Sequence, residues 1–513
     1  MRSSLRVTLA SLCLLAMTAC STNKRTPGEL RFLIESSPNN LDLRQGTDAQ
    51  SERVGALIYE PLVHRDAQFH LQPWLAQSWE RQDANTWVFH LRPNVHFHDG
   101  HIMTSSDVAW TLRSMSNGAL VSAKASAYAK IASIETPDRL TMIVHTSAPD
   151  ASLLFNLSDG LFGVVRDGAG RDEGLHPVGT GPFRFASQTQ DKDVVLERHD
   201  AYWGEGASIP RLRFDVVPDA ITMALEMKRG SADVEANAIT LDEVAALEKT
   251  PSIEASSTPS TTVIYAQFNV ADPALSDVRV RQAIAYALDK PAIISTLWHG
   301  KAIEADSLLP PGHWARASDR DLQQYPHSLK HAMELLDQAG LKPDKDGVRL
   351  RFTLKTSTDE MTRVLAQAVQ QQLRRAGIAM AIRPAEFGTF YADITHGAFQ
   401  MYILRWTGAS NLDPDIFRYA YSSASFPPKG GNRGHYRNDR VDALLKQAAA
   451  ATDESQRRAL YVEVQKILAV DLPSIPLWYP SNVVLHSQRV VDVQPDASGS
   501  FSFLRSAKLR QQK

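Results

Sequence analysis

The sequence predicts a mixed α/β protein of two or three domains, on three observations. The chain has 513 residues, of which 43% are hydrophobic and 22% charged, a composition typical of globular proteins. This length exceeds one ordinary domain of about 100–200 residues, so more than one core is expected. Strand-like and helix-like segments alternate along the chain, as they do where helices pack on a sheet.

Residues 1–20 have the layout of an export signal. Arg2 and Arg6 form a basic start, Leu5–Ala16 is apolar, and Met17–Cys20 ends the segment. The apolar stretch is too short to span a bilayer, and no later run reaches about 18 consecutive apolar residues. We therefore expect an exported protein on the periplasmic or cell-surface side of a membrane.

Both cysteines lie in this signal region, so we expect no disulfide in the mature protein. Cys13 is inside the segment that export removes. Thr18-Ala19-Cys20 is similar to a lipobox, although a Leu-like residue is more usual than Met17, and we predict that Cys20 carries a lipid anchor. Plain cleavage after Ala19 is the alternative, but Met17 fits an A-x-A site badly.

Charge and motifs argue against nucleic acid and against enzymes. The formal net charge is -2 and the two signs are mixed along the chain, so no polyanion-binding surface is indicated. The sequence contains no HExxH helix, no GxSxG elbow and no GxxxxGK[ST] phosphate loop. We therefore expect no catalytic residue, no cofactor and no enzymatic activity.

The first half of the chain has one clear strand and one clear helix. Thr86–Leu91 (TWVFHL) predicts a strand, and Ser105–Met115 predicts a helix with apolar residues along one face. Pro93 and Asp99-Gly100 mark the turns between them. The glycines and prolines of Pro177–Pro182 indicate a tight structural turn more than a ligand loop.

The second half has the clearer α/β order. Ser357 to Glu360 is interpreted as a capping box that starts a helix ending at Gly377. Strand, helix and strand then follow at Ile378–Arg383, Thr389–Thr395 and Gln400–Trp406, which predicts a mostly parallel sheet. Ligands usually bind beyond the carboxyl ends of such strands, and Trp406 lies at one of them.

The segment Val278–Leu288 predicts a helix with one buried apolar face. Its arginines, Arg279 and Arg281, are expected to pair with carboxylates such as Asp277 or Asp289. We interpret this helix as structural.

A histidine cluster supports a rival hypothesis, a metal site. His96, His98, Asp99 and His101 lie close together with His90 nearby, a composition that binds zinc or nickel. However, His101 lies beyond the Asp99-Gly100 turn, and no distant Glu or Cys completes a ligand set. We therefore predict no metal ligands, with the metal site as an alternative.

Many sequence blocks resemble the family 5 extracellular solute-binding proteins of ABC transporters. The blocks keep the family order and comparable spacing from about Glu29 to Leu504. They include YEPLV (Tyr59–Val63), LQPWLAQSWE (Leu71–Glu80), PVGTGPFRF (Pro177–Phe185), SDVRVRQAIAYALDK (Ser276–Lys290) and RWTGASNLDPD (Arg405–Asp415).

The resemblance implies a two-lobed, periplasmic-binding-protein-like fold of class II type with an additional inserted domain. Lobe I would be discontinuous, built from residues 27–60, 178–268 and 483–513. Residues 61–177 would form the inserted domain and residues 269–482 lobe II.

The segment that begins at Trp406 holds the largest group of predicted ligand-binding residues, because it joins a flat apolar ring to hydrogen-bonding groups on a loop. In peptide-binding relatives an aspartate here is thought to receive the peptide's α-amino group, but Ala409 or Ser410 stands at that place. Asp413 could substitute, or could shape the Asp-Pro turn. The predicted residues are Trp406, Thr407, Gly408, Ala409, Ser410, Asn411 and Asp413.

Three further groups of residues are candidates, each with an ordinary structural alternative. Ser37, Pro38 and Asn39 follow the first strand. Tyr265, Gln267 and Asn269 alternate along a strand that crosses between the lobes. Arg433 and His435, in the stretch KGGNRGHY, could meet a ligand carboxylate or could belong to an exposed loop.

The function implied is capture of a small solute, most simply a peptide, by closure of two lobes, and its delivery to permease and ATPase subunits of an importer. We expect the protein to be a monomer and to bind no nucleic acid. Alternative ligands are a nickel or other metal chelate, a sugar or an opine-like compound. An exported metal-dependent hydrolase is the alternative from a different class.

Overall fold

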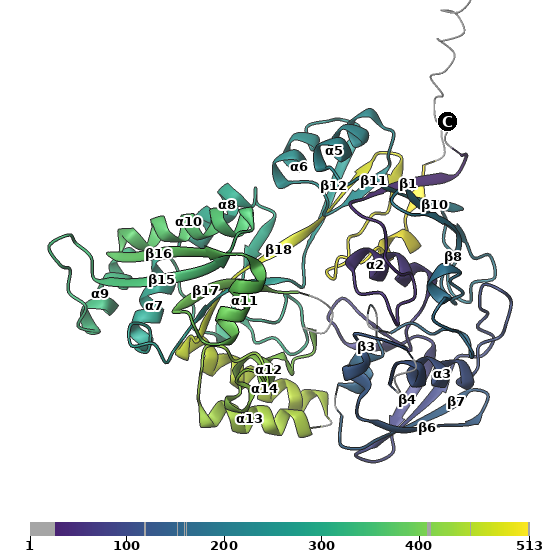
Figure 1. The fold of residues 1–513 in the computed structure, drawn as a ribbon, viewed down its shortest axis with the longest axis horizontal. Helices are drawn as coiled ribbons and strands as arrows, with labels where there is room; N and C mark the ends of the chain where they lie inside the picture. Colours follow the sequence, from purple (N-terminus) through teal and green to yellow (C-terminus); the bar gives the residue numbers. More distant parts are fainter. Residues whose placement is uncertain are drawn as a thin grey trace, which may run out of the picture.

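One sheet of 12 strands runs through both lobes of the elongated molecule (Figure 1). The computed structural model describes residues 26–116, 120–150, 152–158, 160, 162–407, 412–451 and 453–510. The strand order is β16-β15-β17-β13-β18-β11-β1-β10-β9-β8, and β12 and β14 also pair with β18. The sheet therefore joins both lobes.

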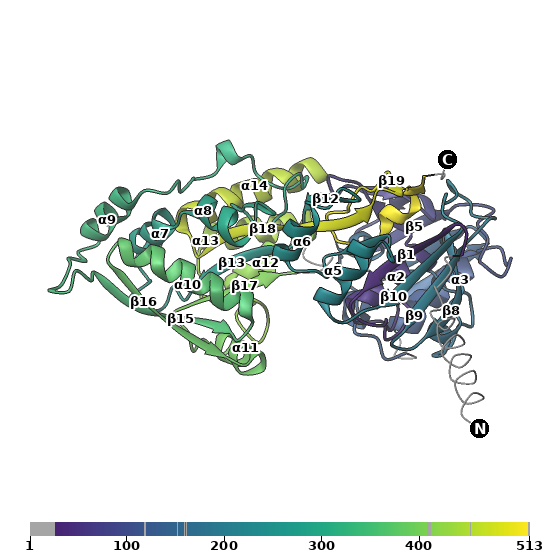
Figure 2. The ribbon, with the colours of Figure 1, turned by 90° about the horizontal axis from the view of Figure 1, so that it is seen from above.

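The strand β18 (Ser474–Ser487) is the link between the two lobes, and Figure 2 shows it crossing from one to the other. Its first half pairs with β13 (Val263–Phe268) and β14 (Ala302–Glu304). Its second half pairs with β12 (Ile253–Pro259) and β11 (Val234–Ala236). The short segment between β12 and β13 crosses beside it, where the Ser260 amide donates to the Pro480 carbonyl at 2.8 Å.

The first lobe is built on the end of the sheet that contains β1. Its other strands are β8 (Phe183–Thr189), β9 (Asp193–Arg198) and β10 (Arg211–Val216). β1 (Glu29–Ile34) lies parallel to both β10 and β11. Its helices are α2 (Ala49–Ile58), α5 (Ala220–Arg229) and α6 (Leu241–Leu247). Phe32 packs against Phe214 and Phe501, so the C-terminal segment returns to complete this core.

The inserted domain lies between α2 and β8 in the sequence and has its own core. A four-stranded antiparallel sheet has the order β4 (Ala76–Arg81), β5 (Thr86–Leu91), β7 (Thr141–Thr146), β6 (Ile131–Asp138). The helices α3 (Ser105–Ser116) and α4 (Leu153–Asn156) and the hairpin β2 (Val63–Arg65)–β3 (Leu71–Pro73) complete it. β5 and α3 confirm the strand and the helix predicted there.

The second lobe contains the other end of the sheet, with β15 (Leu350–Ser357) parallel to β16 (Ile378–Ala385) and to β17 (Met401–Trp406). Trp478 of β18 is fully buried in its core. The remaining helices are α7 (Val278–Ala287), α8 (Lys290–Leu297), α9 (Leu329–Gln338), α10 (Glu360–Arg375), α11 (Phe387–Thr395), α12 (Ile416–Tyr421), α13 (Asp439–Ala450) and α14 (Glu454–Asp471).

The predicted mostly parallel sheet is wrong for the sheet as a whole. Parallel pairing is confined to β1 with β10 and β11, and to β15 with β16 and β17, among the strands described. The other described pairings are antiparallel, because β18 runs back through both lobes and hairpins close the edges.

The predicted capping box is also wrong. Ser357 is the last residue of β15, and Asp359 caps α10 by accepting a hydrogen bond from the Thr362 amide at 2.9 Å. The helix itself and its end before Gly377, which has φ +80°, are confirmed.

Arg281 forms no ion pair with a carboxylate in the described part of the chain, so its predicted pairing is wrong there. Its buried guanidinium donates to main-chain carbonyl oxygens, including those of Leu275 and Leu472, since the end of α14 lies against it. Arg279 does pair with Asp277, at 2.6 Å, as expected.

The turn Pro177–Pro182 is structural, as interpreted. A Cβ at Gly179 or Gly181 would overlap main-chain atoms of Leu57 and Ile58, so this turn packs directly on the end of α2. Within the described ranges, no helix has the length and apolar character needed to cross a membrane.

Candidate functional site

Four aromatic residues form a surface on the second lobe that we call the aromatic face. Phe387 and Tyr391 lie on α11, Trp406 ends β17, and Tyr419 lies on α12. Phe387, Tyr391 and Tyr419 are 55%, 41% and 44% exposed, which is high for large rings grouped together. Figure 1 shows α11 and α12 on the side of this lobe towards the first lobe.

Trp406 is held by rings on two sides. Its indole stacks on Tyr265 with ring centroids 5.6 Å apart and 9° between the planes. Tyr419 meets it edge to face at 6.0 Å. Tyr265 is fully buried on β13, which pairs with β17, so the sheet itself sets the position of the indole. Trp406 therefore presents a fixed flat surface at the strand end.

Arg433 lies beneath the aromatic face and is only 5% exposed. Its Nη2 donates to the Tyr391 hydroxyl at 2.7 Å. The guanidinium carbon lies 4.9 Å from the centroid of the Tyr391 ring and 6.0 Å from that of Trp406. The cation is thus framed by aromatic rings.

Among the described residues, the guanidinium of Arg433 has no anionic partner. It forms no ion pair with a carboxylate in the part of the chain described, and its Nε and Nη1 have no hydrogen-bond partner there. Burial alone would lower the pKa of Arg433, but the phenol oxygens of Tyr402, Tyr265 and Tyr391 raise it overall. A buried cation is costly unless an anion pairs with it, so this geometry suits an anionic ligand group.

The stretch around Arg433 is packed and is not an exposed loop. The Asn432 side-chain amide donates to three carbonyl oxygens, those of Tyr421, Ser422 and Tyr436. A Cβ at Gly434 would overlap the Gln267 amide and the Phe268 carbonyl. The exposed-loop alternative is therefore wrong for residues 431–434, whereas Lys429 and His435 are exposed.

His435 is exposed and adopts φ +57°, and its ring packs on Phe426 at 5.1 Å. No contact brings it to Arg433 or to the aromatic face among the contacts described. Its role towards a ligand stays a prediction.

The candidates on β13 and just beyond it have structural partners. The Gln267 amide donates to the carbonyls of Phe268 and Pro473 at 3.1 and 2.9 Å. The Asn269 amide donates to the Phe399 carbonyl at 3.0 Å. Tyr265 supports Trp406. Direct ligand contacts of these three residues stay predictions.

The candidates after β1 belong to the first lobe. The Ser37 hydroxyl accepts a hydrogen bond from the Asp191 amide at 2.7 Å, and the Pro38 carbonyl accepts one from Gln188 at 3.2 Å. Asn39 is exposed and lines a cavity of about 470 Å³ with Gln188 and residues such as Arg171. None of them contacts the aromatic face in the described structure.

Asp413 is buried near the base of the segment after Trp406. Its Oδ1 lies 3.6 Å from Nη2 of Arg457 and accepts from the Asp415 amide at 2.9 Å, while burial raises the pKa of its carboxyl group. These contacts favour the turn-shaping alternative. Thr407 follows Trp406 and is exposed, and the predicted residues Gly408, Ala409, Ser410 and Asn411 lie outside the described residues, as does Cys20.

The histidine side chains of the alternative metal site contact different partners. His98 is partly buried and contacts the Gly181 carbonyl and the Gly179 amide, and desolvation lowers its pKa to about 4. His96 contacts the Asn94 carbonyl, whereas His101 lies 3.6 Å from Asp107. In the described ranges, no three His, Cys, Asp or Glu side chains lie together as a metal site would require.

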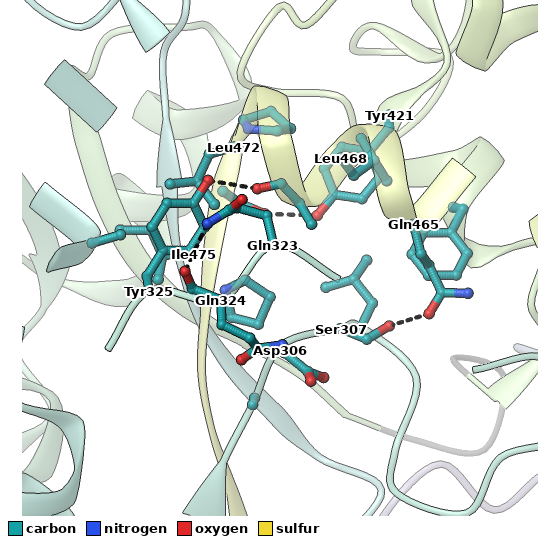
Figure 3. Close-up of a pocket in the computed structure, with 18 of the residues that line it drawn as sticks. Asp306, Ser307, Gln323, Gln324, Tyr325, Tyr421, Gln465, Leu468, Leu472 and Ile475 are labelled. Carbon is teal, nitrogen blue, oxygen red and sulfur yellow. Dashed lines mark hydrogen bonds between the residues drawn. The ribbon is translucent and has the colours of Figure 1, made fainter. Parts of the chain in front are cut away.

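A second cavity, of about 60 Å³, lies entirely within the second lobe (Figure 3). Its polar groups already pair with one another or with the main chain: Ser307 donates to Gln465 at 2.8 Å, and Tyr325 donates to the Ala469 carbonyl at 2.7 Å. Tyr421 and Ser474 form a further pair at 2.7 Å. The residues drawn do not converge on a shared ligand position, so we place the candidate site at the aromatic face instead.

Sequence reasoning found Trp406 and Arg433 but missed Phe387, Tyr391 and Tyr419. The signal for two of them was present, since Phe387 and Tyr391 are four residues apart and lie on one helix face. The helix was expected to start at Thr389, and its true start at Phe387 brings both rings to the site.

The comparisons agree on one family. The family of bacterial extracellular solute-binding proteins, family 5 Middle, matches residues 70–427. The dipeptide-binding protein of Escherichia coli (strain K12) is 26% identical over 95% of this chain and 94% of its own length.

Two solved structures are similar over nearly the whole chain. NikA from Brucella suis in complex with Fe(III)-EDTA has a TM-score of 0.82 at 25% identity, covering 94% of this chain and 100% of its own. DppA from Helicobacter pylori in complex with peptide STSA has a TM-score of 0.71 at 26% identity, covering 94% of this chain and 98% of its own. The α/β, two-lobed fold with its inserted domain and the match over most of the chain show that this protein belongs to the family 5 bacterial extracellular solute-binding proteins.

Proposed function

We propose that this protein is the substrate-binding component of an ABC importer and captures a short peptide between its two lobes. The observation that carries the proposal is Arg433, a buried cation without a carboxylate partner in the described ranges, framed by Tyr391 and Trp406. A peptide's terminal carboxylate would supply the anion, and the rings would contact its apolar groups.

Peptide is favoured as the ligand class because relatives with this architecture bind peptides. The similar Escherichia coli protein is a dipeptide-binding protein, and the similar Helicobacter pylori structure holds a peptide. The Brucella suis structure holds an iron chelate, so an anionic metal chelate is the competing ligand. Its carboxylates would suit Arg433 as well, and only binding measurements separate the two.

The proposed mechanism is lobe closure about β18 and the segment between β12 and β13. The ligand first contacts one lobe, and contact with the second lobe shifts the population towards the closed form by the difference in affinity. In this mechanism Trp406 covers the ligand on one side. Ser37, Pro38 and Asn39 would approach it from lobe I, and Thr407 and residues 408–411 from lobe II.

The proposal includes the domain division 27–60, 178–268 and 483–513 for lobe I, 61–177 for the inserted domain and 269–482 for lobe II. It also includes a lipoprotein signal peptide within residues 1–20 that is cleaved before Cys20, a lipid anchor on Cys20, permease and ATPase subunits as partners, and no enzymatic activity. The family's extracellular character supports export.

Titration calorimetry and native mass spectrometry test this proposal. Protein freed of co-purified ligand is titrated with di-, tri- and tetra-alanine, with their C-terminal amides, and with the nickel–histidine complex. We expect binding of free peptides, weaker binding of amides, and unchanged peptide on recovery. Binding of the chelate alone, or hydrolysis of the peptides, would contradict the proposed function.

A further inference from the structure

The tip of the β2–β3 hairpin reaches from the inserted domain into the second lobe. The Trp314 amide donates to the Gln68 carbonyl at 3.0 Å, which is a direct main-chain contact between the two parts. Next to it, Phe69 stacks on the ring of His313 at 5.3 Å with 20° between the planes. Phe69 is buried although it lies on a hairpin tip.

The backbone at Phe69 has φ +66°, a left-handed conformation that costs energy for a residue with a bulky side chain. Glycine would adopt it without strain. The hairpin therefore holds a strained residue where its ring packs on His313 of the other lobe. The turn alone would favour glycine at this position, so the phenylalanine is present for its ring.

His313 connects this ring to the chain that follows Trp406. Its Nδ1 accepts from the Ala315 amide at 3.0 Å, so in the neutral ring the proton lies on Nε2, which donates to the Leu412 carbonyl at 2.8 Å. Burial lowers the pKa of His313 to about 4, which keeps this form at neutral pH. The imidazole thus joins the inserted domain to Leu412.

Leu412 is fixed from several sides. It belongs to a small buried cluster with Phe69 and Phe155 of the inserted domain, against which Trp314 packs. Ala497, in the C-terminal segment, packs there too. Residues of the inserted domain, of the second lobe and of the C-terminal segment therefore meet at Leu412.

The contacts continue from Leu412 to the aromatic face. Asp413 lies 3.6 Å from Arg457, and the Arg457 guanidinium lies 5.7 Å from the Trp314 ring. The Ile416 amide then donates to the Asp413 carbonyl at 3.0 Å and starts α12. Tyr419 of that helix packs on Trp406.

We infer that the inserted domain sets the geometry of the ligand surface, with Phe69 and His313 as positioning residues that fix Leu412 and, through it, α12 and Tyr419. The inference rests on the proposed function in so far as the aromatic face binds the ligand. It assigns a role to the inserted domain that needs no contact between that domain and the ligand.

The variants Phe69→Ala and Phe69→Gly test the role of the ring. Both variants remove the phenyl ring. Glycine also adopts a positive φ without strain, so Phe69→Gly should keep the hairpin folded even if Phe69→Ala loosens it. Val121→Ala, at a residue of the same domain that is 88% exposed, is the control. Phe69→Tyr keeps the ring and is the rescue variant.

Hydrogen exchange measures the effect directly. We expect amides of residues 412–421 to exchange about tenfold faster in both ring-deleted variants, with β5 and β15 unchanged and with Phe69→Tyr close to wild type. The affinity for tri-alanine should fall in parallel. Unchanged exchange at 412–421 in folded Phe69→Gly would overturn the inference, as would an equal rise throughout the protein.

The exchange measurement separates this inference from the proposed function. It requires no ligand, so the inference about position can be judged even if the wild-type protein binds none of the peptides. In that case only the proposed peptide function is contradicted, and the positioning role is still tested. If peptides bind and exchange at 412–421 does not change, only the positioning role fails.

Discussion

Trp406 and Tyr265 lie face to face, with ring centroids 5.6 Å apart and planes 9° from parallel. Tyr265 is fully buried and Trp406 is partly exposed, so the Tyr265 ring supports the indole from below and the indole forms the accessible surface. This arrangement holds a flat apolar surface at the end of β17 through a contact with the neighbouring strand. Replacement of Trp406 is therefore expected to change ligand binding more than it changes folding.

The variant Trp406→Ala should weaken peptide binding about tenfold, since a stacking surface of this size contributes on the order of 1 kcal/mol. The melting temperature should fall by only a few degrees because the indole is only partly buried and lies at the edge of the core clusters. Calorimetry and thermal unfolding measure the two effects. Trp406→Phe keeps a ring and should retain most of the affinity; equal affinities of wild type and Trp406→Ala would show that the face does not bind the ligand.

The variant Arg433→Met should reduce affinity and preserve or raise stability. The arginine is buried and has no carboxylate partner in the described part of the chain, so its replacement removes an uncompensated charge. For a peptide with a free carboxylate we expect an affinity loss of at least about tenfold, and little loss for the C-terminal amide. Arg437→Met, at an exposed arginine nearby, is the matched control. An equal loss for acid and amide would contradict carboxylate recognition.

Local periodicity predicted the separate elements well, and contacts distant in sequence account for most of what was missed. β5, α3, α10 and β17 follow from period-2 and period-3.6 patterns. The role of β18 could not be predicted, because its 14 residues pair with strands that lie far away in the sequence. The start of α11 was displaced because its cap is Glu386, which is a weak sequence signal for a helix start.

The same limit applies to the candidate site. The strand-end position of Trp406 was evident from the order of elements. The burial of Arg433 was not, because it depends on Asn432 and Gly434 packing against β13 and α12. Residues of a Gly-rich stretch resemble a loop until their neighbours are known.

The variant Gly434→Ala should destabilise the protein and lower affinity together. An added methyl group would overlap the Gln267 amide and the Phe268 carbonyl, and neither can move without breaking hydrogen bonds to the main chain. We expect a loss of about 1–3 kcal/mol in unfolding free energy. Chemical denaturation measures it, with Gly206→Ala as control because no atom lies within 4 Å of a Cβ there. Equal stability of the two variants would contradict the tight packing described here.

The buried pair of rings at Phe69 and His313 should make the protein sensitive to acid. Burial lowers the pKa of His313 from 6.5 to about 4, so between these values the unfolded chain binds a proton that the folded chain does not. Stability from this group is complete above pH 6.5 and is lost as the pH falls towards 4. His313→Gln, which can donate to the Leu412 carbonyl without titrating, should show a smaller loss between pH 7 and pH 4 in denaturant titrations. An unchanged pH profile in this variant would contradict the assignment.

Glu235 should have the opposite effect at higher pH. It is buried on β11, its Oε1 has no hydrogen-bond partner in the described structure, and burial raises the pKa of its carboxyl group to about 8. The folded protein therefore keeps a proton that the unfolded chain releases near pH 4.5. Stability is complete below that value and falls as the pH rises to about 8, by at most about 1.4 kcal/mol per pH unit.

The variant Glu235→Gln removes this titration and should be more stable than wild type at pH 9, by at least about 1 kcal/mol, with a smaller difference at pH 5. Denaturant unfolding at the two pH values measures both differences. Glu80→Gln, at an exposed glutamate, serves as the control and should follow wild type. If the difference between Glu235→Gln and wild type were the same at pH 5 and pH 9, the carboxyl group would not carry a raised pKa. The gain at pH 9 would then have to come from packing.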